Sequence, residues 1–272
     1  MRTFPLFCLV ILFGLLGCSS DSTQIEPEPE EPQTYFPPKD SDNWETITAE
    51  ELNWHPDQLQ PLLDYLQEKH TKSFIMLYDG KIVVESYMNG HSATLPWYWA
   101  SAGKTLTSTV TGIAQDEGLL DINNKVSDYL GTGWTSESLD KENLILCKNL
   151  LSMDSGLDDS KGDDVSPENL FYVADAGDRW AYHNVYVKLQ DVVAQASDQS
   201  WSEYFNKKLR DPIGMTGSWI AMDNLSVYWS TARSMARFGL LVYAKGKWES
   251  TQIVSEDYLS QATNTSQEIN KA

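Results

Sequence analysis

The chain has 272 residues, of which 41% are hydrophobic and 11% aromatic, enough apolar material for one sizeable domain or two small ones. This composition excludes disorder as the overall state. Acidic residues number 39 and basic residues 20, so the formal net charge of −19 disfavours nucleic acid as a partner. The three cysteines, Cys8, Cys18 and Cys147, match no zinc site and cannot build a disulfide framework, so no metal is expected.

Residues 1–17 have the pattern of a signal peptide. Arg2 precedes an apolar run over residues 4–16 that is too short to span a bilayer comfortably. The run ends in Leu-Leu-Gly-Cys at residues 15–18, which resembles the lipobox of bacterial lipoproteins, where the cysteine is lipidated. The resemblance implies a lipid anchor at Cys18 and a location in the bacterial cell envelope, facing the periplasm or the outer surface. An ordinary secreted protein is the alternative.

Residues 18–45 are predicted to form an acidic, proline-rich tether. Glutamates and prolines alternate over residues 26–32, and self-repelling carboxylates with prolines favour an extended, solvated chain. Ordered structure is expected from about Thr48. The sequence thus divides into a signal peptide, this tether and one folded domain over residues 46–272.

The folded part opens with a helix and a hairpin. Leucines at i, i+3, i+4 and i+7 over residues 59–66 predict an amphipathic helix that ends near His70. Two β-rich runs, residues 74–78 and 82–87, flank Asp-Gly at 79–80, a pair that favours a two-residue type I′ turn. We therefore predict a β-hairpin here.

The remainder of the chain is predicted to be mostly helical. Residues 102–117 read as a helix closed by Gly118, because glycine readily adopts the left-handed conformation that ends helices. Further helical patterns cover residues 139–151, 185–197, 201–209 and 231–244.

Ser-Ala-Gly-Lys at residues 101–104 is the first motif with chemical meaning. At the start of a helix Ser101 and Lys104 share one face, so the hydroxyl and the amine can meet. A serine hydroxyl is a weak nucleophile until a base takes its proton, which a partly desolvated lysine can do. The helix N-terminus adds N–H donors near the developing oxyanion. The structural alternative is a capping serine beside an exposed lysine.

Tyr-His-Asn at residues 182–184 is the second motif. The Tyr182 phenol can share a proton with Ser101 and Lys104, acting as general base in acylation and as acid toward the leaving group. Asn184 can orient Lys104 or hold a substrate amide. A core tyrosine and a helix-capping asparagine are the structural alternatives.

With these motifs the chain resembles the serine β-lactamase and penicillin-recognising enzyme superfamily, in its class C β-lactamase-related branch of esterases, D-peptidases and small-amide hydrolases. The concordant segments lie at residues 79–80, 101–104, 150–157, 180–184, 211–215 and 230–239. The resemblance implies an α+β fold, an antiparallel sheet flanked by helices plus a mostly helical subdomain. It also implies that Ser101 is the acylated nucleophile, Lys104 its partner base, and Tyr182 with Asn184 the Tyr-x-Asn element.

The family's third motif, a Lys/His-x-Gly on a sheet strand, has no counterpart before Ala272. In the family this strand supplies a second oxyanion N–H, and loss of one such donor costs about 3 kcal/mol of transition-state stabilisation. The chain is then either a fragment of a longer product in which the C-terminal strands follow, or a degenerate member of the family. We expect the fragment, because the preceding motifs are intact.

Several other residues receive lesser roles. Four aromatic residues flank the motifs and are candidates for the wall of an acyl pocket, or for the core: Trp97, Tyr98, Trp99 and Trp180. His183 is expected at most to line the pocket, and Cys147 to be a buried small apolar residue. Four aspartates are expected in a solvated loop, although calcium binding is conceivable: Asp158, Asp159, Asp163 and Asp164.

The sequence therefore predicts a membrane-tethered serine hydrolase that forms an acyl-enzyme on Ser101. Its substrate is expected to be an ester, a small amide, a D-peptide or a β-lactam, and no cofactor is implied. The alternative is a non-catalytic surface lipoprotein that binds a glycan or peptide in an aromatic cleft, since the chain contains 10 tryptophans and 13 tyrosines.

Overall fold

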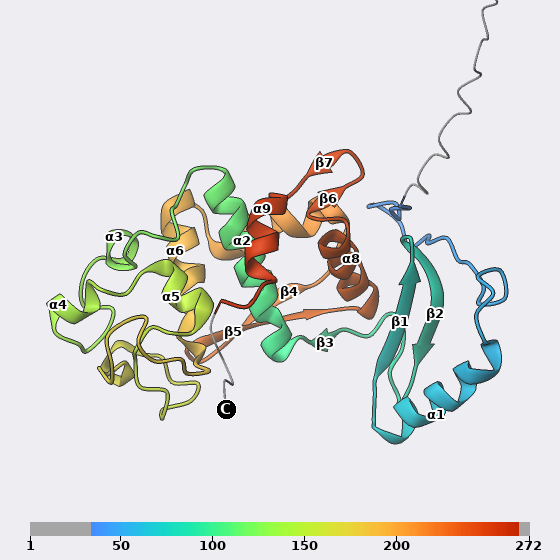
Figure 1. Ribbon diagram of the computed structural model, residues 1–272, viewed down its shortest axis with the longest axis horizontal. Coiled ribbons are helices and arrows are strands. Elements are labelled where there is room, and N and C mark those ends of the chain that lie inside the picture. Colours follow the sequence, from blue (N-terminus) through green and yellow to red (C-terminus); the bar gives the residue numbers. More distant parts are fainter. Residues whose placement is uncertain (1–33, 267–272) are drawn as a thin grey trace, which may run out of the picture. The chain divides into compact units, whose positions relative to one another are not determined.

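The computed structural model describes residues 34–266, and Figure 1 shows their arrangement. The α-helices are α1 (Leu59–Glu68), α2 (Gly103–Asp116), α3 (Ser127–Leu130), α4 (Leu139–Glu142), α5 (Cys147–Ser152), α6 (Lys188–Ser197), α7 (Trp201–Phe205), α8 (Ala232–Tyr243) and α9 (Glu256–Ala262). The strands are β1 (Ser73–Tyr78), β2 (Lys81–Tyr87), β3 (Trp97–Tyr98), β4 (Ser218–Met222), β5 (Leu225–Ser230), β6 (Lys247–Trp248) and β7 (Thr251–Gln252). Short 3₁₀ turns are η1 (Pro56–Gln58), η2 (Ala100–Ala102), η3 (Pro167–Asn169), η4 (Asn184–Val187) and η6 (Asp211–Ile213), and η5 (Asn206–Arg210) is a π-helix.

The fold is of the expected α+β class, but the expected single sheet is divided into smaller ones in the described residues. Strands β1 and β2 form one antiparallel pair, β3, β5 and β4 form a three-stranded antiparallel sheet in that order, and β6 pairs with β7. The predicted hairpin is present, and its turn residues Asp79 and Gly80 have φ of 45° and 83°. These positive angles fit the type I′ turn that the Asp-Gly pair favours.

The hairpin is joined to helix α8 by an ion pair. Arg233 of α8 donates from Nε and Nη2 to the two carboxylate oxygens of Glu85 in β2, at 2.7 and 2.8 Å. Such a two-pronged contact is stronger than a single hydrogen bond because both charges are engaged in fixed geometry. The guanidinium lowers the pKa of Glu85, against the effect of its burial.

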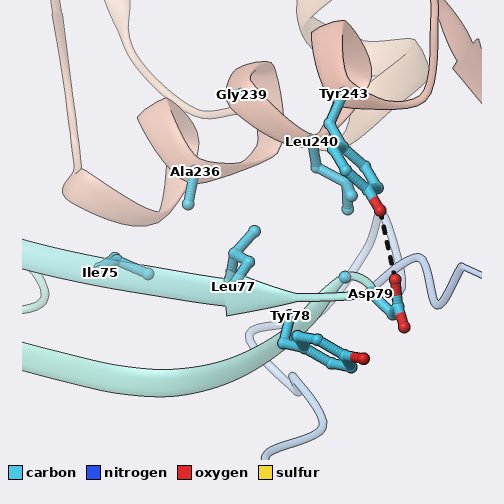
Figure 2. A pocket seen from close by; sticks show the side chains of 9 residues that line it. Ile75, Leu77, Tyr78, Asp79, Ala236, Gly239, Leu240 and Tyr243 are labelled. Carbon is cyan, nitrogen blue, oxygen red and sulfur yellow. Dashed lines mark hydrogen bonds between the residues drawn. The ribbon is translucent and has the colours of Figure 1, made fainter.

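An apolar hollow of about 370 Å³ lies between β1 and α8. Figure 2 shows Leu77 of β1 directed toward Ala236 and Leu240 of α8, and Ile75 lines the same hollow. One end is bridged by a hydrogen bond of 3.2 Å between the Tyr243 phenol and the Asp79 carboxylate. None of the candidate catalytic residues lines this hollow.

The main core forms around helix α2. Leu106, Val110 and Ile113 repeat along one face of the helix and are almost completely buried, as are Leu189, Val192 and Val193 of the adjacent α6 (Figure 1). Burial of each such side chain contributes about 1.5–3 kcal/mol. A buried hydrogen bond of 3.2 Å from the Gln190 amide to the Thr107 hydroxyl also joins the two helices. The core therefore fixes the orientation of α2, at whose start Ser101 stands.

One predicted helix is wrong. Residues 139–151 do not form a single helix but split into α4 and α5. The reason is a competing backbone contact: the Val126 N–H donates to the carbonyl of Ile145, and Lys125 forms an antiparallel bridge with Leu146. The predicted helix at 201–209 likewise changes into a π-helix after Phe205, whereas the patterns at 102–117 and 231–244 are confirmed within one residue.

Packing begins earlier than the expected Thr48. The Tyr35 N–H donates to the carbonyl of Asp79, and the buried Arg237 guanidinium of α8 donates to the carbonyls of Pro37, Pro38 and Ser41. The later part of the predicted tether thus lies against the domain. The signal peptide, Cys18 and the tether up to residue 33 lie outside the described residues, so their predictions stay predictions.

In the part of the chain that the structure describes, no helix combines the length and apolar character needed to cross a membrane.

Candidate active site

Ser101 stands at a junction between sheet and helix. Strand β3 ends at Tyr98, pairs with β5 through Tyr98 opposite Trp229, and is followed by the turn η2 that contains Ser101. Ala100, directly before Ser101, has a φ of 45°, which is uncommon for a residue with a side chain. Strained backbone of this kind persists where the surroundings enforce it, and it is often found at functional sites. The helix itself starts at Gly103, one residue later than the sequence predicts.

The structure brings Lys104 to Ser101. The Lys104 ammonium Nζ donates to the Ser101 hydroxyl Oγ at 3.1 Å, as the i, i+3 spacing predicts. Nζ also lies over two aromatic rings, 4.9 Å from the ring centroid of Tyr182 and 4.4 Å from that of Tyr186. Both ring faces attract a cation, so they hold the amine beside the serine. Tyr186 lies outside both sequence motifs, so no local pattern predicts its place beside Lys104.

Tyr182 completes the arrangement. Burial acts to raise the pKa of its phenol, but hydrogen bonds with Ser101 and Lys104 and the lysine's positive charge outweigh it, so the pKa is lowered. Its segment is fixed where the Ala181 N–H donates to the Met153 carbonyl at 2.9 Å. The three groups predicted to share a proton therefore meet at one place. Tyr186 differs, because burial raises its pKa to about 12 and keeps it a neutral ring.

A cavity of about 450 Å³ opens beside Ser101 and Lys104. Its other lining residues come from the β3–α2 junction, the Tyr-x-Asn segment, an acidic loop and strands β4 and β5: Tyr98, Ala100, Asp163, Asn184, Tyr186, Met222, Leu225, Ser226, Val227 and Trp229. Asn184 is directed to the acidic loop, where its amide donates to the Asp163 carboxylate at 2.5 Å. The described contact of Asn184 is thus with Asp163 and not with Lys104.

Three predicted pocket residues lie elsewhere. Trp99 belongs to the core, where its indole N–H donates to the Ser230 hydroxyl and its ring packs on Tyr228. His183 is only 3% exposed and does not line the cavity, and burial lowers its pKa. Both inward orientations follow from the alternation of side chains along an extended chain. Tyr98 and Tyr182 are exposed, so their neighbours Trp99 and His183 point inward. Trp180 is 44% exposed but also stands outside the cavity lining. Of the four aromatic residues that flank the motifs, Tyr98 lines the cavity and the other three do not.

The remaining candidates for chemistry are structural. Cys147 is buried, and burial raises the pKa of its thiol to about 12, so little thiolate forms near neutral pH. Asp159 accepts from Arg179, and Asp164 accepts from the amides of Asn169 and Asn224. Within residues 34–266 no group of three or more His, Cys, Asp or Glu side chains is arranged to hold a metal ion.

Comparison of the sequence with models of known protein families identifies one family. The model of the Beta-lactamase family matches residues 66–268, which is most of the chain and includes both motifs. The protein belongs to the beta-lactamase family. It is accordingly a serine hydrolase of this family. A search of curated protein sequences gives no match.

Solved structures of this family share the fold at low sequence identity. A protein assigned as a 6-aminohexanoate-dimer hydrolase from Bacillus anthracis aligns over 84% of this chain and 69% of its own, with 17% identity and a TM-score of 0.67. A protein assigned as a beta-lactamase from Bacteroides dorei aligns over 75% and 68%, with 18% identity and a TM-score of 0.65. A class C beta-lactamase variant aligns over 75% and 69%, with 15% identity and a TM-score of 0.60.

Proposed function

We propose that this beta-lactamase-family chain hydrolyses a small carboxylic ester or amide through an acyl-enzyme on Ser101. The observation that carries the proposal is the convergence of the Ser101 hydroxyl, the Lys104 amine and the Tyr182 phenol beside a cavity that Ser101 and Lys104 line. In such a group a base can take the serine proton while the nucleophile stays aimed at a bound carbonyl.

The reaction divides into two acyl transfers. The Ser101 oxygen attacks the carbonyl carbon while its proton passes to the Lys104–Tyr182 pair, and the tetrahedral intermediate then collapses with loss of the leaving group. The same pair returns the proton to the departing oxygen or nitrogen. A water molecule then attacks the acyl carbon, gives up a proton to the pair, and releases the acid as Ser101 recovers its hydrogen. The Ser101 N–H assists by donating to the oxyanion.

The substrate class within the family remains ester, small amide, D-peptide or β-lactam. Proteins of similar fold carry names from several of these classes, among them a 6-aminohexanoate-dimer hydrolase, a D-stereospecific amidohydrolase and class C beta-lactamases. At 14–17% identity these names do not transfer individually. The apolar and aromatic lining of the cavity supports a small substrate with an apolar body.

A covalent probe tests the nucleophile. A fluorophosphonate should label the chain at Ser101, located by mass spectrometry of peptides, and Ser101→Ala should abolish labelling. Ser92→Ala, which changes a partly exposed serine outside the cavity, is the matched control and should label as the wild type does. Labelling at another residue, or equal labelling of the Ser101→Ala variant, would refute the assignment. Turnover of a chromogenic ester or cephalosporin then distinguishes hydrolysis from binding without reaction.

We also propose that the mature chain begins at Cys18 and is anchored by lipid in the bacterial cell envelope. The support is the Leu-Leu-Gly-Cys sequence after an apolar run of signal-peptide length. Expression in a bacterium with labelled palmitate should give a labelled membrane fraction, and Cys18→Ser should lose the label. Cys8→Ser, within the part that is removed, should behave as the wild type. Retained label in the Cys18→Ser variant would overturn the proposal.

A further inference from the structure

The cavity beside Ser101 holds one carboxylate. Asp163 lines it together with Ser101 and Lys104, and the Asn184 amide fixes one carboxylate oxygen, Oδ1, at 2.5 Å. Among residues 34–266 the other oxygen, Oδ2, has no hydrogen-bond partner, and the carboxylate forms no ion pair. A charged acceptor is thus held in place in the cavity with one oxygen able to bind a ligand.

The wall that leads to Asp163 is apolar. Met222, Leu225 and Val227 line this cavity and also line a second hollow, which Asp163 shares as well. The second hollow is lined by three acidic residues, Asp163, Asp164 and Asp223, and by one basic residue, Lys161. The formal charge of its lining is therefore −2. The catalytic cavity therefore runs along apolar side chains from the nucleophile to a region of negative charge.

We infer that the substrate bears a positively charged amino or quaternary ammonium group, joined by an apolar chain to the carbonyl that Ser101 attacks, with Asp163 as its counter-ion. This inference rests on the proposed acyl-transfer function and specifies its substrate class. The Lys104 ammonium is already engaged by Ser101 and two aromatic rings, whereas one oxygen of the Asp163 carboxylate is open to a ligand, so Asp163 is the side chain that can pair with a cation of the substrate. An anionic group would face the aspartates and be disfavoured.

Matched esters provide the test. We compare p-nitrophenyl esters of ω-trimethylammonio acids with their neutral isosteres, in which a tert-butyl group replaces trimethylammonium, and with hemiesters of dicarboxylic acids of equal length. A quaternary group is chosen because it cannot attack its own ester. For the wild type, kcat/KM of the cationic ester should exceed that of the isostere by about fivefold, as for an exposed ion pair, and the anionic ester should be slowest.

Variants assign the preference to one side chain. Asp163→Asn should bring the cationic-to-neutral ratio of kcat/KM close to one, whereas Asp40→Asn, which removes the same charge at an exposed site outside both hollows, should leave the ratio at its wild-type value. A ratio of one in the wild type, or an unchanged ratio in Asp163→Asn, overturns the inference while Ser101-dependent turnover upholds the function. Absence of Ser101-dependent turnover of every ester overturns both.

Discussion

Gly112 in helix α2 allows the close approach of α9. A Cβ built on Gly112 would lie 2.3 Å from two ring atoms of Tyr258, far inside van der Waals contact. The ring cannot easily move, because it is 5% exposed and its phenol donates to the Ser108 carbonyl at 2.8 Å. We therefore expect Gly112→Ala to destabilise the protein through overpacking.

The magnitude follows from two opposing effects. Alanine in place of glycine favours the helix by about 1 kcal/mol, whereas overpacking a rigid core costs up to about 3 kcal/mol. The net loss of about 2 kcal/mol should lower Tm by about 4–8 °C. Gly239 of helix α8 provides the control, because a Cβ there meets nothing within 4 Å. Gly239→Ala should raise Tm by about 2–4 °C.

Thermal unfolding monitored by circular dichroism measures both variants. Shifts of opposite sign are the expected result, and a double-mutant cycle with Tyr258→Leu should show a coupling of about 2 kcal/mol, since the smaller side chain removes the obstacle. Equal shifts for the two glycines, or no coupling with Tyr258, would refute the argument that α2 and α9 pack through this contact.

Three further outcomes are expected. Tyr186→Leu should lower kcat/KM about fivefold because Lys104 loses a ring face, whereas Tyr186→Phe keeps the ring and should stay within about twofold of wild type; equal effects would contradict the role. Tyr182→Phe should lower kcat/KM by about 10²–10⁴-fold and abolish a rise in rate with pH through a pKa below 10; a retained rise assigns it to another group. Burial and nearby carboxylates raise the pKa of Glu137 to about 7, above its unfolded value of 4.5, so stability falls as pH rises from about 4.5 to 7. Chemical unfolding of Glu137→Gln at pH 5 and pH 8 should show a smaller difference than the wild type, and an equal difference would exclude Glu137 as its source.

The sequence predicts those parts of the structure that depend on interactions between residues close together in the chain. Asp-Gly at 79–80 predicts the hairpin because its backbone preference is intrinsic to those two residues. The helical patterns at 102–117 and 231–244 mark faces that become buried, and the spacing of Ser101 and Lys104 brings them together where the turn η2 leads into the first of these helices. The contact of Tyr182 with this pair is predictable only from the resemblance to a family.

Long-range contacts account for most of the errors. Residues 143–146 have helical periodicity, yet their backbone groups pair with residues 125 and 126, which no local pattern reveals. One error has a local cause: Trp99 and His183 are predicted to line the pocket as neighbours of motif residues, but side-chain alternation directs both into the interior. Asp163 lies in an exposed loop as the sequence predicts, but its hydrogen bond with Asn184 joins positions 21 residues apart and is not predictable from a local pattern.

Arg237 has a practical consequence for where the protein can be trimmed. Arg237 is 5% exposed, and its guanidinium donates to the carbonyls of Pro37, Pro38 and Ser41. A recombinant form that starts at α1 would keep the Arg237 guanidinium but lose most of its carbonyl acceptors. A buried charge that loses its hydrogen-bond partners strongly destabilises a protein. The shortest stable form should therefore retain residues 35–45, although they contain no helix and no strand of their own.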